Sequence, residues 1–83
     1  MNQEQRKVYL KRSILDILNT SGSYLTPESA LYSQSILIID PAPTRIEFDE
    51  TIRSLAADLF ITNIRDAFGT TKWKITDTGR SVL

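Results

Sequence analysis

The sequence predicts an α+β fold, in which a bundle of three helices is followed by a C-terminal two-stranded β-hairpin. Apolar residues recur at helical spacing over most of residues 4–60. Residues that favour the start of a helix follow the two segments that interrupt this spacing, at residues 21–23 and 40–43. Near the end of the chain, Lys72-Trp73-Lys74-Ile75-Thr76 alternates between polar and apolar side chains, as a β-strand does. A chain of 83 residues has room for one hydrophobic core, so residues 1–83 are expected to form a single domain.

The first helix is predicted over residues 4–20. Its core positions fall at helical spacing: Leu10, Ile14, Ile17 and Leu18. Ser21-Gly22-Ser23 supplies the break that ends the helix. Val8 and Leu15 widen the apolar face beyond the roughly 100° that a single core contact requires. Two neighbouring elements that cover the helix would explain this width, and so would a dimer seam.

The second helix is predicted from Pro27 to about Ile38, after a short extended link at Tyr24-Leu25. Thr26-Pro27-Glu28 is a start signal, because a Thr hydroxyl caps free amides, Pro loses no hydrogen bond at the first helical position, and an acid suits the positive end of the helix dipole. One side is expected to face the core: Ala30, Leu31, Gln34, Leu37 and Ile38. The β-branched run over residues 36–39 leaves a strand as the alternative for the end of this helix.

The third helix is predicted to follow the connector Asp40-Pro41-Ala42-Pro43, whose prolines disfavour helix. Thr44 and Glu47 fit a capping box, in which each side chain accepts a bond from the other residue's amide. The helix is expected to run to Phe60 with a buried stripe: Phe48, Ile52, Leu55, Ala56 and Leu59. The outward face is then mainly acidic: Glu47, Glu50, Thr51, Arg53, Ser54, Ala57 and Asp58.

The hairpin is predicted to begin with a β-prone run at residues 61–66, which Phe68-Gly69-Thr70-Thr71 breaks. In the alternating strand that follows, Trp73 and Ile75 are expected to face the core and the two lysines to face water. Residues 77–83 are expected to form a short turn whose apolar end folds back onto the first helix.

The composition excludes several classes of function. The chain has no Cys and no His, so disulfides, Cys/His zinc sites and catalysis that depends on either residue are excluded. It has no glycine-rich phosphate loop and no EF-hand spacing. We therefore expect neither an enzyme nor a bound metal or cofactor. The N-terminus has no signal-peptide pattern, and no stretch approaches the ~20 apolar residues of a membrane span, so a cytoplasmic protein is expected.

The charges are unevenly distributed although their sum is zero. Residues 1–12 carry four Lys or Arg against one acid, residues 13–58 carry two against seven, and residues 59–83 carry four against two. Both ends are therefore basic and the middle is acidic. The placement of charge, more than its total, governs association with a polyanion.

The order of elements resembles that of the winged helix-turn-helix families of bacterial transcription regulators, over nearly the whole chain. The last third carries the motif: residues 68–80 look like the wing of these families and their closing turn, Ile/Leu-Thr-x-x-Gly-Arg, and the helix at residues 52–59 precedes them. The resemblance implies a winged helix whose third helix enters the major groove while the wing follows the phosphate backbone or the minor groove. It implies a small DNA-binding regulator or accessory protein of bacterial or phage type.

The candidate DNA contacts lie on the predicted third helix and wing: Arg45, Arg53, Arg65, Thr70, Thr71, Lys72, Lys74 and Arg80. Arg53 is the candidate base reader, and Arg45 is a phosphate contact near the start of the helix. Lys72 and Lys74 share one face of a strand, and with Arg65 and Arg80 they are expected to engage the phosphate backbone. The first helix carries a secondary basic patch: Arg6, Lys7, Lys11 and Arg12.

Each of these assignments has a structural alternative. The arginines of the third helix can pair with its acids, and lysines on a hairpin can serve solubility and protect a sheet edge. Trp73 and the tyrosines can stack on bases, but an aromatic residue between lysines is more often a core anchor. The functional alternative is a winged helix that binds protein, as a homodimer through the first helix or docked on a basic partner. The acidic face of the third helix favours this alternative.

Overall fold

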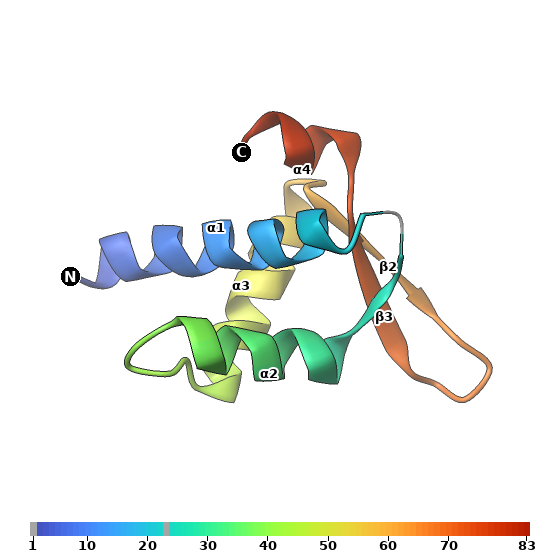
Figure 1. Ribbon diagram of the computed structural model, residues 1–83, viewed down its shortest axis with the longest axis horizontal. Coiled ribbons are helices and arrows are strands. Elements are labelled where there is room, and N and C mark those ends of the chain that lie inside the picture. Colours follow the sequence, from blue (N-terminus) through green and yellow to red (C-terminus); the bar gives the residue numbers. More distant parts are fainter. Residues whose placement is uncertain (1, 23) are drawn as a thin grey trace.

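Helices and an antiparallel sheet alternate along the chain in the computed structural model, which describes residues 2–22 and 24–83 (Figure 1). Met1 and Ser23, the latter part of the break predicted after the first helix, lie outside the described residues. The elements, in order, are α1 (Gln3–Thr20), β1 (Thr26–Pro27), α2 (Glu28–Ile38), α3 (Arg45–Ala57), β2 (Ile61–Arg65), β3 (Thr71–Ile75) and α4 (Asp77–Ser81). The predicted α+β class and the predicted order of three helices and a hairpin are confirmed.

The sheet has three strands in the order β1-β3-β2, so the prediction of a two-stranded hairpin is incomplete. β1 pairs antiparallel with β3, with Thr26 opposite Trp73 and Pro27 opposite Lys72. A segment of two residues shows no periodicity, and for that reason the sequence pattern does not predict it.

The start of α2 differs from its prediction because Thr26 and Pro27 form β1 and are not part of the helix. Thr26 is held in β1, and its hydroxyl donates to Ser21 Oγ (3.2 Å), so it does not cap the helix. Pro27 takes the N-cap position with no side-chain cap bond, and Glu28 is the first helical residue.

Fewer residues of α2 are buried than the sequence predicts. Leu31 and Ser35 are its buried residues, whereas Leu37 is 86% exposed and Ile38 is exposed. Ile39, just after the helix, turns into the core. The helix continues to Ile38, so the alternative of a strand at residues 36–39 is wrong.

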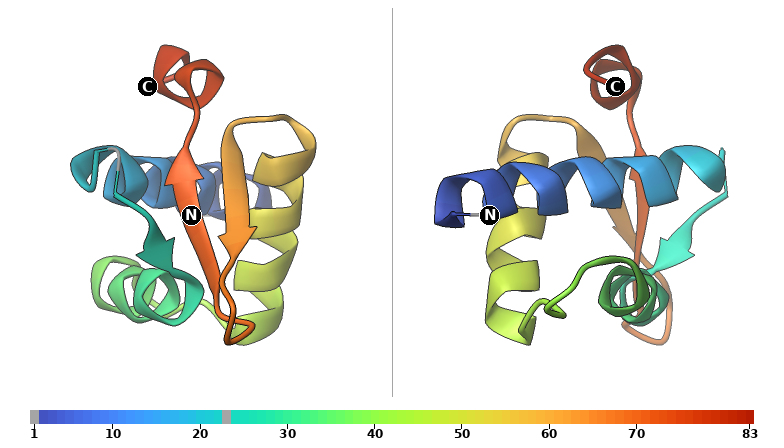
Figure 2. Two further views of the ribbon diagram at one scale, coloured as in Figure 1. Left: turned by 90° about the vertical axis from the view of Figure 1, so that its right-hand side faces the viewer. Right: turned by 60° about the vertical axis from the view of Figure 1, so that its left-hand side comes forward.

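α1 crosses the domain and packs against α2, α3 and β3 (Figure 2). Its buried residues include the four predicted core positions and Leu15. Val8, by contrast, is 65% exposed. Neighbouring elements therefore account for the wide apolar face at Leu15 but leave Val8 uncovered.

α3 begins at the predicted capping box: Thr44 Oγ1 accepts from the Glu47 amide (3.1 Å), and Glu47 Oε1 accepts from the Thr44 amide (3.1 Å). The helix ends at Ala57 and not at Phe60. Thr51, predicted to face outward, is buried, with its hydroxyl donating to the Glu47 carbonyl (2.8 Å).

The end of α3 is a Schellman turn. The Phe60 amide donates to the Leu55 carbonyl (3.0 Å) and the Leu59 amide to the Ala56 carbonyl (3.1 Å). Leu59 has a φ of 64° and is exposed, so it is not part of the predicted buried stripe. The turn redirects the chain into β2.

The core lies between the helices and the inner face of the sheet. The predicted burial of Trp73 and Ile75 is confirmed, as is that of Phe48, Ile52 and Leu55. Tyr32 packs beside this cluster with its ring centroid 5.1 Å from that of Phe48. The buried side chains come from all three long helices and from the hairpin: Leu10, Ile14, Leu15, Ile17, Leu18, Leu31, Ile39, Phe48, Ile52, Leu55, Ile61, Trp73 and Ile75.

The predicted closing turn is the short helix α4, which Thr76 caps. Thr76 Oγ1 accepts from the Gly79 amide (3.0 Å) and donates to the Leu59 carbonyl (2.6 Å), and the Thr76 amide donates to the Phe60 carbonyl (3.0 Å). These bonds fasten the end of β3 to the turn after α3. α4 contacts α1, but Val82 is exposed, so the apolar C-terminal end is not buried there.

Candidate nucleic-acid interface

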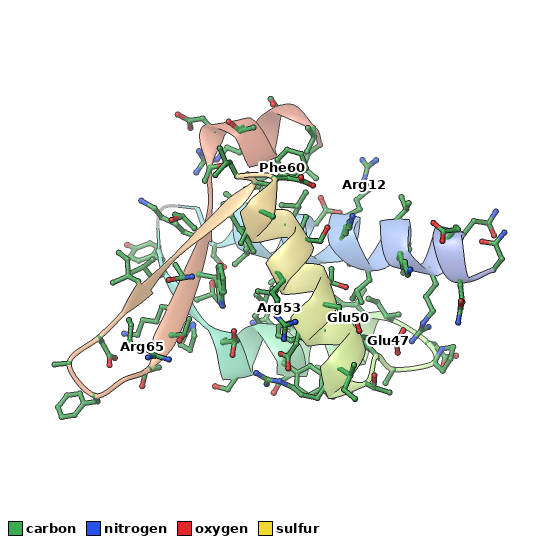
Figure 3. All side chains as sticks on the ribbon, turned by 180° about the vertical axis from the view of Figure 1, so that it is seen from behind. Arg12, Glu47, Glu50, Arg53, Phe60 and Arg65 are labelled. Carbon is green, nitrogen blue, oxygen red and sulfur yellow. The ribbon has the colours of Figure 1, made fainter. Side chains whose placement is uncertain are left out.

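The outer side of α3 and the hairpin border a shallow hollow. Its lining comes from α2, α3 and the sheet: Glu28, Asp49, Ile52, Arg53, Ala56, Asn63 and Trp73. Figure 3 shows Arg53 on α3 and Arg65 toward the loop end of the hairpin. An α-helix has the diameter that a DNA major groove admits.

Arg53 and Arg65 are the arginines of α3 and the hairpin that remain available to a ligand. Both are exposed, and neither forms an ion pair within residues 2–22 and 24–83. A guanidinium group offers several donors in a fixed plane and suits both guanine edges and phosphates.

The register of the hairpin separates the cations that were predicted to act together. In the β2–β3 pair Asn63 lies opposite Trp73 and Ile64 opposite Lys72. Because side chains alternate between the faces of a sheet, Arg65 lies on the Trp73 face, and Lys72 and Lys74 lie on the other. The three residues therefore do not share one face of the hairpin, and their joint contact with one backbone stays a prediction.

Asp66 organises the loop between β2 and β3. Its Oδ1 accepts from the amides of Thr70 (3.0 Å) and Phe68 (2.9 Å), and Lys72 Nζ lies 3.8 Å from its Oδ2. The bond from the Thr70 amide, together with that from Phe68 and the charge of Lys72, lowers the pKa of Asp66. Lys72 is thus partly neutralised, and the loop is held by its own residues.

The tip of this loop differs from its prediction. Thr71 is the first residue of β3, opposite Arg65, so Thr70 is the threonine that the loop exposes. Phe68 is 95% exposed beside it. An aromatic side chain this exposed on a fixed turn is a candidate partner contact.

Arg45 forms two ion pairs within the domain. Its Nη2 lies 2.7 Å from Glu28 Oε2, and its Nε lies 3.0 Å from Asp49 Oδ1. The guanidinium also lies over the rings of Tyr32 and Phe48, 5.3 and 5.4 Å from their centroids. These contacts match the alternative of a helix-surface ion pair, so a phosphate contact at Arg45 would have to compete with Glu28 and Asp49 and stays a prediction.

Glu28 joins the hairpin to the same network, because Trp73 Nε1 donates to its Oε1 (3.1 Å). One carboxylate of α2 thus binds a side chain from α3 and another from β3. This arrangement links α3 and the hairpin through Glu28, which also lines the hollow.

Arg80 lies away from the hollow. It belongs to α4, at the opposite end of the sheet from the loop, and its Nη1 lies 2.8 Å from Asp77 Oδ1 (Figure 1). It cannot act with Arg65 on one short segment of backbone.

Two of the four residues of the predicted basic patch on α1 pair with acids. Arg6 Nε donates to Glu47 Oε2 (2.9 Å) and Arg6 Nη2 to the Pro41 carbonyl (2.8 Å), while Lys7 lies 4.0 Å from Glu4. The bond from Arg6, with that from the Thr44 amide, lowers the pKa of Glu47. Arg12 is exposed on α1 (Figure 3).

Acids interrupt the positive charge between α1 and the hollow. A groove between α1 and α3 is lined by Arg6, Lys7 and Lys11 and also by Glu47 and Glu50. Asp58 is exposed at the end of α3. Carboxylates therefore lie among the cations between α1 and α3.

Asn63 was missed as a candidate. It lines the hollow next to Trp73, and an Asn side chain can bind both N6 and N7 of adenine. Its position follows from the pairing register, which depends on the number of residues in the loop. Counting back from Trp73 across a five-residue loop, Asp66 to Thr70, would have found it.

No family model, curated protein or solved structure matches this chain. Within residues 2–22 and 24–83, no helix combines the length and the apolar character that crossing a membrane requires.

Proposed function

We propose that this chain is a winged-helix domain, without catalytic activity, that binds duplex DNA in the cytoplasm through the hollow between α3 and the hairpin. One observation carries the proposal: Arg53, Asn63 and Arg65, three exposed groups that can bind nucleic acid, lie around or beside that hollow from two different elements. In this arrangement α3 enters the major groove and the loop of the hairpin lies along the backbone.

The three residues have different roles in this proposal. Arg53 projects from the middle of α3 and reads a base, with guanine as the matching partner, and Asn63 lies near enough to the hollow to read an adenine beside it. Arg65 and the Thr70 hydroxyl bind phosphate. Glu50 weakens nonspecific attraction because it repels phosphates, although a carboxylate can accept from cytosine.

The proposal predicts a weak dependence on salt. Few phosphates are neutralised, since Arg45, Lys72 and Arg80 are ion-paired, so the logarithm of the binding constant should fall with the logarithm of salt concentration at a slope of only about −1 to −3. Arg65→Gln should make this slope shallower by about 1.

Fluorescence anisotropy with a mixed-sequence labelled duplex tests these statements. Arg53→Gln and Arg65→Gln should each weaken binding at low salt, whereas Arg80→Gln, at the far end of the sheet, should leave it unchanged. Lys72→Glu with Lys74→Glu should weaken binding less than Arg65→Glu, because these lysines lie on the other face. Absence of binding at low salt, or an equal loss in the Arg80 variant, would contradict the proposal.

A second candidate is a winged helix that binds a basic protein. The observation that favours it is the acidic outer side of α3, where Glu50 and Asp58 are exposed. A pull-down from nuclease-treated extract separates the two candidates: a protein partner remains bound after nuclease, and its loss in Glu50→Lys would assign it to this face.

A further inference from the structure

The first half of α1 presents an apolar surface that the described part of the domain leaves open. Val8 and Tyr9 are exposed there, and a shallow hollow around them is lined by Glu4, Gln5 and Arg12 as well. Val8 does not contribute to the core in this position, and exposed apolar side chains that cluster on one surface are typical of contact sites.

This surface extends onto the end of α2. Tyr9 and Ile38 line one hollow between the two helices, and both are exposed. Leu37, the neighbour of Ile38, is also exposed. The apolar area therefore spans two helices, and a partner that covers α1 can reach α2 as well.

The charges on this surface are complementary to those on the same surface of a second copy. Glu4, Val8 and Arg12 are spaced four residues apart, so they follow one side of α1, with the acid and the base equidistant from the valine. If two copies of α1 pack antiparallel about a twofold axis at Val8, Glu4 of each copy lies opposite Arg12 of the other.

Both charged groups are available for that contact. Arg12 is exposed and forms no ion pair within the described segments. Within residues 2–22 and 24–83, the ion pair of Glu4 is with Lys7, at 4.0 Å and with both side chains largely exposed, which is a weak interaction.

We propose that the occupant of this surface is a second copy of the chain, with the two α1 helices antiparallel and crossing near Val8. A partner of one charge sign would match only half of the surface, whereas a second copy satisfies both charges at once. The dimer does not use Arg53 or Arg65, so this inference is independent of DNA binding and can fail without it.

Cysteine cross-linking tests the geometry directly, because the chain has no cysteine of its own. A twofold axis at Val8 brings the two Val8 side chains together, so Val8→Cys should form a disulfide-linked dimer on mild oxidation. Asn19→Cys, exposed near the other end of α1, should stay monomeric under the same conditions. Equal cross-linking of the two variants would contradict the antiparallel arrangement.

Charge exchange tests the pairing in solution. Sedimentation equilibrium should show a monomer–dimer equilibrium whose dissociation constant rises about tenfold or more in Glu4→Arg and in Arg12→Glu, because each change acts twice across the axis. The double variant should recover most of that loss. Circular dichroism checks that each variant is folded. A wild-type chain that stays monomeric at all concentrations, or a dimer that neither change weakens, would overturn the proposal.

Discussion

Leu59 holds the left-handed backbone conformation that ends α3, with a φ of 64°. This position of a Schellman turn usually carries glycine, because a Cβ makes the conformation unfavourable by about 1–2 kcal/mol. The Leu59 side chain is exposed and makes little compensating contact. The strain is confined to one residue between α3 and the sheet.

Leu59→Gly is therefore expected to stabilise the protein, by up to about 1 kcal/mol. Urea denaturation measures the change. The matched control is Asp58→Gly, one residue earlier at a negative φ, which should be neutral or destabilising. Equal destabilisation by both glycines would show that Leu59 is not strained.

Gly79 illustrates the opposite case, a glycine that is needed for space. A Cβ at this position would collide with the Phe60 carbonyl and with the Ile75 side chain. In the closing motif Ile75-Thr76-Asp77-Thr78-Gly79, the threonine makes the hydrogen bonds that fasten α4, and the glycine allows the close approach.

Gly79→Ala should destabilise the fold by about 1–3 kcal/mol, because backbone must move to admit the methyl group. Thr78→Ala, exposed on the same short helix, should change the free energy of unfolding by less than about 0.5 kcal/mol. Thermal or urea unfolding measures both. A neutral Gly79→Ala would mean that α4 does not pack against the turn as described.

At the scale of elements, an ion pair between Arg6 and Glu47 joins α1 to α3 and is partly shielded from solvent. Glu47 also closes the capping box at Thr44. Both bonds favour the carboxylate form, and the pKa of Glu47 lies below its ordinary value of 4.5 for that reason.

This junction should make stability depend on pH. A depressed pKa in the folded protein means that the ion pair contributes stability above the unfolded value and loses it as pH falls through the folded value. Glu47→Gln should therefore lower the urea midpoint at pH 7, and its difference from wild type should shrink below about pH 4. Glu50→Gln, exposed on the same helix, is the control. A difference that stays constant with pH would contradict this assignment.

The elements show which features the sequence could predict. The capping box at Thr44 and the burial of Trp73 and Ile75 depend on residues a few positions apart, and both are confirmed. The face on which Arg65 lies depends on the hairpin register, and the ion pair of Arg45 depends on Glu28, 17 residues away. Periodicity carries no information about such pairings.

At the scale of the whole molecule, ion pairs use much of the positive charge that the sequence shows. The cations counted from the sequence suggested a basic hairpin and a basic α1, but acids close in sequence pair with Lys7, Lys72 and Arg80, and Glu47 of α3 pairs with Arg6. What remains near α3 is a small site around Arg53 and Arg65, beside acidic side chains. If this site binds DNA, as we propose, it does so through a few directed contacts, with little general attraction to a polyanion.

Chemical-shift mapping tests that central claim most directly. ¹⁵N-labelled protein is titrated with a mixed-sequence duplex at low salt, and the amide and side-chain signals are followed. The largest shifts are expected at Arg53, Asn63, Arg65 and Thr70. Shifts confined to Arg12 on α1 or Arg80 on α4, or no shifts at all, would contradict binding at the hollow between α3 and the hairpin.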